Sequence, residues 1–107
     1  MDENFRVIYR ILRTLERAMD AEEFDAKGIS AQTLGISEQR WTHLIEMLAD
    51  EEYVKGITIA RDAAGNTFTS IAFPRITLKG LEYLSENSVM KRMYKAAKGI
   101  ADILPMP

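Results

Sequence analysis

The residues that could do chemistry are few, and their spacing does not assemble a catalytic site. His43 is the only histidine and the chain has no cysteine, so neither a His-rich nor a thiolate metal site is expected. Glu46 follows His43 by one helical turn, a pair that would hold a metal only weakly. Because His43 is the only side chain that could act as a base near neutral pH, no serine has a credible base partner for nucleophilic catalysis. We therefore predict a protein that is not an enzyme and that carries no cofactor.

The acidic and glycine residues also lack the spacing of an active site. The carboxylates at 22–25 and 50–52 form runs rather than a pair held across a cleft. Gly65 and Gly80 stand alone, so no glycine-rich phosphate loop is present. The absence of cysteine favours a reducing cytoplasm, and no apolar run reaches the roughly 18 residues of a membrane helix.

The order of local patterns along the chain is that of a winged helix. Helical periodicity predicts a first helix over residues 1–19. Ser30 and Ser37 are good N-caps on either side of Gly35, which suits a left-handed helix end, so a helix–turn–helix is expected over 30–51. Two β-rich runs around Gly65 predict a wing hairpin over 53–73.

Two more helices, over 77–87 and 88–104, complete the expected architecture. The fold class is α+β, a winged helix-turn-helix with an additional C-terminal helix, in a single domain of residues 1–107. We also expect Ile29 in a short first strand and Pro74 at the end of the wing pairing. Gly80 is tolerable in its helix if another backbone packs closely there.

Helical periodicity also assigns the buried face of each predicted helix. The expected core side chains are Phe5, Ile8, Leu12, Leu15 and Met19 in the first helix, Trp41, Leu44, Ile45 and Leu48 in the second helix of the helix–turn–helix, and Leu78, Leu81, Tyr83 and Leu84 in the helix after the wing.

The net charge of −2 conceals a division along the chain. Residues 21–52 hold two basic and eight acidic groups, whereas residues 89–107 hold four basic groups and one acidic group. The segment that contains the helix–turn–helix is therefore the most acidic part of the chain. Charge distribution bears on the choice of partner more directly than total charge does.

In a DNA-binding winged helix, the second helix of the motif enters the major groove and the wing touches the duplex beside it. Glutamine and arginine can recognise adenine and guanine edges, so Arg40→Ala should weaken any binding to double-stranded DNA. The acidic helix–turn–helix, and a wing tip whose one arginine is offset by Asp62, argue against a strong DNA binder. The candidate DNA contacts are Gln39, Arg40, Thr42 and His43 at base edges, with Lys55 and Arg61 on phosphates.

The alternative is a protein–protein interaction module with no nucleic-acid role. Four arginines of the first helix, Arg6, Arg10, Arg13 and Arg17, form a basic ridge that is either a solvated face or a site for an acidic partner. The expected C-terminal helix either forms a homodimer or packs on the first helix of a monomer. Its candidate interface residues are Met90, Met93, Tyr94 and Ala97.

Three segments resemble one known family. The stretches 5–16, 34–41 and 74–88 look like the YjcQ family, small winged-helix proteins of Gram-positive bacteria and their prophages, and the last stretch is the most specific. The resemblance implies a winged-helix fold and a cytoplasmic, often phage-linked setting. It brings no catalytic residue with it. We expect a regulatory or accessory protein of DNA-binding type, with the interaction module as the alternative.

Overall fold

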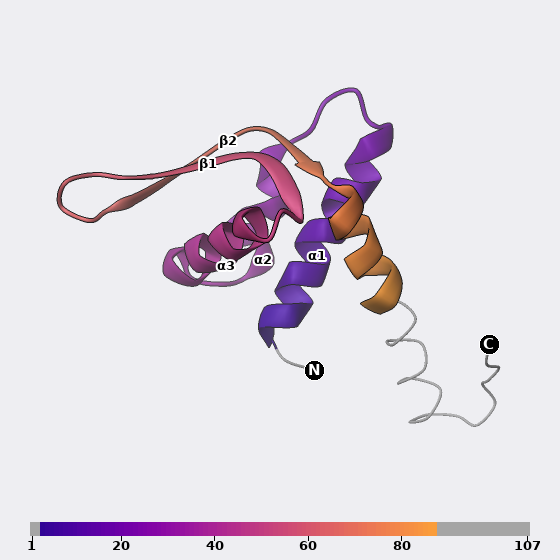
Figure 1. The fold of residues 1–107 in the computed structure, drawn as a ribbon, viewed down its shortest axis with the longest axis horizontal. Helices are drawn as coiled ribbons and strands as arrows, with labels where there is room; N and C mark the ends of the chain where they lie inside the picture. Colours follow the sequence, from indigo (N-terminus) through magenta and orange to yellow (C-terminus); the bar gives the residue numbers. More distant parts are fainter. Residues whose placement is uncertain (1–2, 88–107) are drawn as a thin grey trace.

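The structure, a computed structural model, describes residues 3–87, and the expected C-terminal helix over 88–104 lies outside this range. The chain is an α+β winged helix (Figure 1). No helix within the described part is both long and apolar enough to cross a membrane. The elements follow in the order α1 (Glu3–Arg17), η1 (Ala18–Asp20), η2 (Ala26–Ile29), α2 (Ala31–Leu34), α3 (Glu38–Asp50), β1 (Val54–Arg61) and β2 (Thr67–Ile76), and then a helix over residues 78–87.

The apolar face of α1 contributes a third of the buried hydrophobic residues within the described part of the chain. Its fully buried side chains are Val7, Ile11, Leu12 and Leu15. The prediction placed Phe5 and Met19 on this face, and it is wrong for both: they are 54% and 63% exposed. The buried arc is centred near Ile11 rather than near Leu12, because Val7 is packed inward in place of Phe5. The rest of the buried hydrophobic core is Ile29, Ala31, Leu34, Leu44, Ile45, Leu48, Val54 and Leu84.

The helix–turn–helix forms through the predicted local signals. The Ser30 hydroxyl accepts from the Thr33 N–H, and the Ser37 hydroxyl accepts from the Arg40 N–H, so both serines are N-caps. Gly35 ends α2 in the left-handed conformation, with φ of 74°. These caps satisfy backbone groups that a short helix would otherwise leave unpaired.

Ile29 does not form the expected strand. It ends the 3-10 turn η2, whose N-cap Asp25 accepts from the Lys27 N–H. Ile29 is fully buried, and its carbonyl accepts a 2.7 Å hydrogen bond from Trp41 Nε1. A strand is not needed here, because the side chain of α3 supplies the partner that a neighbouring strand would otherwise provide.

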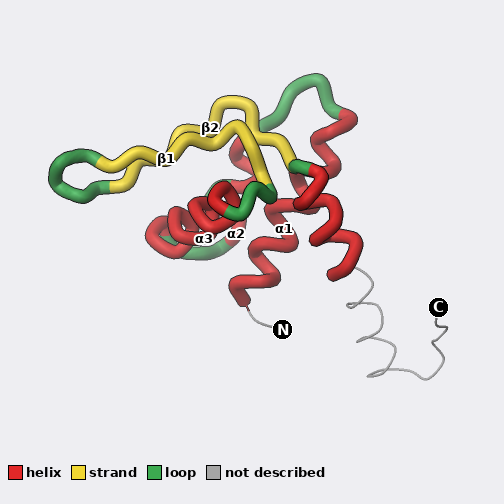
Figure 2. Tube along the Cα trace, viewed as in Figure 1, coloured by secondary structure: helices red, strands yellow, loops and turns green. Residues whose placement is uncertain are grey.

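The wing is a two-stranded antiparallel hairpin with a bulge near its root. Ile57 pairs with Ile71 and Lys55 pairs with Arg75, so Gly56 lies opposite the extra residues 72–74. Pairing therefore continues to Ile76, and the expectation that Pro74 would end it is wrong. Proline is tolerated because it lies in the bulge, where the ladder needs no N–H from it. Figure 2 shows the hairpin projecting well beyond the helices.

The helix over residues 78–87 is fastened to the turn between α3 and β1. The Thr77 hydroxyl donates to the Glu52 carbonyl at 2.6 Å, and the hydroxyl oxygen of Thr77 accepts from the Gly80 N–H. A Cβ on Gly80 would lie 2.5 Å from the Tyr53 carbonyl oxygen, so the expected close backbone approach is present. Leu78, predicted on the inner face, is 73% exposed, because the buried face is centred on Gly80 and Leu84 instead.

Gly56 is the position where the wing tolerates no side chain. Its φ is +84°, and an added Cβ would lie 1.9 Å from the Phe73 carbonyl oxygen. We expect Gly56→Ala to lower the free energy of unfolding by about 3 kcal/mol, since steric overlap adds to left-handed backbone strain. Urea unfolding followed by circular dichroism measures this loss.

The matched control is Gly65→Ala at the tip of the wing. Gly65 has a similar φ of +89°, but no atom lies within 4 Å of an added Cβ. Only backbone strain applies there, and we expect a loss of about 1 kcal/mol. Equal losses for the two variants would contradict the close packing at the bulge.

Candidate functional site

The outward face of α3 brings together most of the predicted base-contacting residues. Gln39 and His43 are exposed one turn apart, and Thr42 is half-buried beside them. Met47, one turn further along, is 55% exposed. The N-terminal half of this face is therefore polar and uncharged, which suits hydrogen bonding to a partner but supplies no attraction for phosphates.

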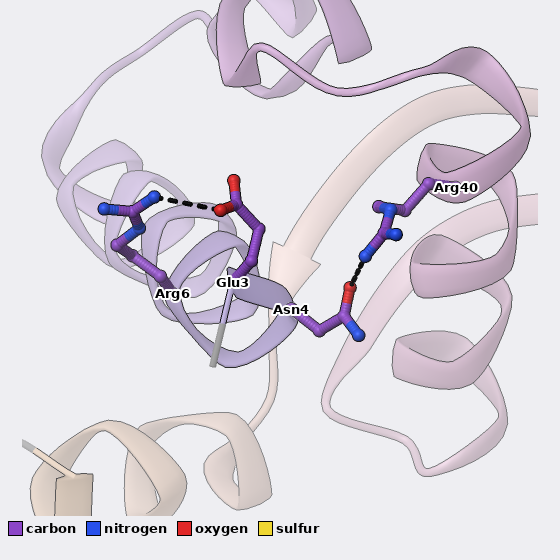
Figure 3. A network of polar contacts seen from close by, with 4 residues as sticks. All are labelled: Glu3, Asn4, Arg6 and Arg40. Carbon is purple, nitrogen blue, oxygen red and sulfur yellow. Dashed lines mark hydrogen bonds and ion pairs between the residues drawn. The ribbon is translucent and has the colours of Figure 1, made fainter. Parts of the chain in front are cut away.

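Arg40 is turned toward α1 instead of standing free on this face. Its Nη1 donates to the Asn4 side-chain oxygen in the first turn of α1. Figure 3 shows the two side chains meeting across the space between α1 and α3, with the Glu3–Arg6 pair on the other side of α1. One donor of this exposed guanidinium is therefore already used within the chain.

Arg61 forms an ion pair within the protein. Its Nη2 lies 2.7 Å from Glu46 Oε2 on α3, and the Glu46 side chain is only 25% exposed. The ion pair joins the wing to α3 and offsets the arginine charge at the place where a wing would meet a phosphate. Local spacing in the sequence gives no sign of this pair, because its members are 15 residues apart on different elements.

Lys55 lies apart from the other predicted contacts. It begins the wing opposite Arg75, whereas Arg61 ends the same strand. Arg61 lies six positions further along the extended strand than Lys55, a distance of about 20 Å. The structure therefore does not gather the six predicted DNA contacts into one patch.

The C-terminal half of α3 is acidic. Glu46 and Asp50 lie on the outward side, and Glu51 and Glu52 follow in the exposed turn after the helix. The partial negative charge of a helix C-terminus adds to these carboxylates. A polyanion approaching α3 and the wing would meet repulsion here that the engaged arginines do not offset.

Asp62 organises the tip of the wing, a role that the sequence interpretation missed. Its carboxylate accepts from the Ala64 N–H, the Asn66 N–H and the Asn66 side-chain amide. The Asn66 backbone and side-chain hydrogen bonds, in that order, lower the pKa of Asp62 below its usual 3.8. The spacing Asp-x-x-Gly is a known turn signal that could have revealed it.

The low pKa of Asp62 makes the wing tip sensitive to acid. Because the folded pKa is depressed, the carboxylate stabilises the turn above pH 3.8 and loses this effect as the pH falls through the folded value. We expect the amide resonances of Ala64 and Asn66 to shift together in an NMR titration, with a midpoint below 3.8. Asp62→Asn should abolish the transition, and a midpoint at or above 3.8 would argue against the carboxylate as the turn's anchor.

A second polar surface lies on α1, away from the α3–wing face. A groove along the solvent side of this helix is lined by arginines and aromatic residues and ends near Asn87 in the helix over residues 78–87. Sequence periodicity predicted the basic ridge but not the groove, because the groove depends on how the two helices lie together. The lining residues are Phe5, Arg6, Tyr9, Arg10, Arg13, Thr14, Arg17 and Asn87.

The remaining predicted sites are not reached by the described part of the chain. Met90, Met93, Tyr94 and Ala97, the candidate dimer residues, lie outside residues 3–87. Within that range, no group of three or more His, Asp or Glu side chains lies together in a way that could hold a metal ion.

One comparison with known proteins identifies a family. A family model described as YjcQ protein matches residues 9–103, which is most of the chain. Searches of curated proteins and of solved structures found no significant match. The match agrees with the resemblance seen in the residues themselves, and the chain belongs to the YjcQ protein family.

Proposed function

We propose that this protein is a non-enzymatic, regulatory or accessory winged-helix protein that acts by binding another protein. The observation that carries the proposal is the state of the two arginines expected to meet DNA. Arg40 is hydrogen-bonded to Asn4 and Arg61 is ion-paired with Glu46, so both are already engaged within the chain. DNA affinity rests largely on basic groups that are available to neutralise phosphates.

The wing supports the same proposal. Its outward face carries uncharged side chains, among them Thr58, Ser70 and the 57%-exposed Phe68. Phe73 near the bulge is 80% exposed. Exposed aromatic residues are enriched in protein interfaces, whereas phosphate contacts rely on basic side chains.

A DNA-binding regulator is the second candidate. It is favoured by the exposed Gln39 and His43 on the N-terminal half of α3, the half that approaches base edges in helix–turn–helix proteins. In this case Arg40 exchanges Asn4 for a base, and Arg61 exchanges Glu46 for a phosphate. The cytoplasmic, prophage-linked setting expected from the family resemblance suits either candidate.

A duplex titration at low salt separates the two candidates. We expect the full chain to show no binding to a labelled random duplex at about 50 mM salt, where non-specific attraction is strong. Fluorescence anisotropy measures the binding. Saturable binding that weakens with salt and with Arg40→Ala would overturn the protein-binding proposal in favour of DNA.

Glu46→Gln sharpens the same experiment. The substitution removes a negative charge and releases Arg61, while the loss of an ion pair with an exposed arginine costs only about 0.5 kcal/mol of stability. If α3 and the wing bind DNA, Glu46→Gln should strengthen binding several-fold. If the protein-binding proposal holds, the variant should gain at most weak, salt-sensitive attraction. Glu82→Gln, on the helix after the wing, is the control for the change in net charge.

A homodimer through the segment 88–104 is part of the proposal. The apolar residues Met90, Met93, Tyr94 and Ala97 repeat at helical spacing and would form its interface. Sedimentation equilibrium at high micromolar concentration should give the dimer mass, and Met93→Glu should return the monomer. A monomer at that concentration would exclude the dimer.

A further inference from the structure

The four arginines of α1 form one straight row. They are separated by steps of four, three and four residues, so they fall within an arc of about 60° around the helix. The row extends for about 16 Å along the helix axis. It lies opposite the buried face, because Ile11 and Leu15 point into the core from the other side of the same helix. The members of the row are Arg6, Arg10, Arg13 and Arg17.

The charges of this row are only lightly engaged. Arg6 pairs with Glu3 and Arg13 pairs with Glu16, both on α1 itself and on exposed side chains. Unlike the Arg61–Glu46 pair, whose carboxylate is only 25% exposed, these pairs join exposed side chains one turn apart on the same helix, and such pairs are weak. Arg10 and Arg17 make no ion pair within residues 3–87.

The groove that contains the row also has an apolar component. Phe5, which is 54% exposed, and Tyr9 line it together with the arginines. The groove therefore offers a basic row and an adjacent aromatic surface along one helix. A solvated charged face needs no such aromatic neighbour.

From these observations we propose that the groove on α1 binds an acidic amphipathic helix of a partner protein. Carboxylates three and four residues apart on a helix repeat at the same 5–6 Å spacing as the arginines, so a helix lying along α1 can pair with all four. Apolar residues beside those carboxylates would pack on Phe5. This inference rests on the proposed protein-binding function and names its site and the chemistry of its partner.

The chemistry of the groove also favours an acidic helix over two other possible occupants, the C-terminal segment of this chain and a nucleic-acid duplex. Residues 88–107 of the chain hold four basic groups and one acidic group, so their net charge does not complement that of the groove. A nucleic-acid duplex has the required sign of charge, but its phosphate backbone presents no apolar surface to Phe5. An acidic amphipathic helix satisfies both parts of the groove.

The test uses the full chain and a defined peptide. The probe is a fluorescein-labelled helical peptide of about 18 residues with glutamates at i, i+4, i+7 and i+11 and leucines beside them. The matched peptide has glutamine at those four positions, which keeps helix propensity and removes charge. We expect anisotropy to show binding of the glutamate peptide at low salt and at least about tenfold weaker binding of the glutamine peptide.

Two double variants locate the site on the protein. Arg10→Glu with Arg17→Glu should weaken binding of the glutamate peptide by about tenfold or more. Arg75→Glu with Lys79→Glu makes the same change in net charge on exposed residues outside the groove, and it should leave binding within about twofold. Circular dichroism checks that both variants keep the fold.

Three results would overturn the inference: no binding of the glutamate peptide, equal losses in the two double variants, or displacement of the peptide by duplex DNA at equal charge concentration. Failure here leaves the proposed function standing if the duplex titration is negative, since another surface would then hold the partner. Duplex binding that depends on Arg40 would instead remove the proposed function itself.

Discussion

The burial of α1 is the constraint on which the rest of the structure depends. This helix places Val7, Ile11, Leu12 and Leu15 in the core. Since side chains on a helix turn by a fixed angle per residue, burying this face also sets the direction of every other α1 side chain. The arginine row is therefore solvent-facing as a consequence of core packing, and the Asn4 side chain is brought against Arg40 of α3 for the same reason.

The wing is positioned by contacts at both ends of β1. At its root, the bulge at Gly56 bends the hairpin, and Thr77 joins the turn after α3 to the helix that follows the wing. At the far end, the Arg61–Glu46 pair holds the strand beside α3. The contact between the wing and α3 thus also occupies the arginine of the wing, which leaves less free positive charge on the α3–wing face.

The two polar surfaces of this YjcQ-family protein differ in what they offer a partner. The α3–wing face has uncharged polar groups, carboxylates and engaged arginines, whereas the α1 groove has four arginines whose only ion pairs within residues 3–87 are local and exposed. Winged-helix folds serve both DNA and protein binding, so the fold alone does not choose between them. On the basis of the available charge we propose a protein partner that binds at the α1 groove.

Local signals in the sequence determined the order of elements. Caps and turn residues such as Ser30, Ser37, Gly35 and Gly65 act over a few residues, so they can be recognised without knowledge of the fold. The sequence also carried the division of charge between the helix–turn–helix and the helices at the two ends. The resemblance to the YjcQ family could also be recognised from the sequence alone, because it lies in three contiguous stretches of residues.

Tertiary packing decided everything that depends on residues distant in the chain. The rotation of α1 that exposes Phe5, the inward turn of Gly80 in place of Leu78, and the continuation of pairing past Pro74 all result from what neighbouring elements leave room for. The engagement of Arg61 by Glu46 is of the same kind, because periodicity assigns a side chain to a face but cannot say which element lies opposite it. The sequence by itself therefore placed the charges along the chain, and only the fold settled which of them are already paired.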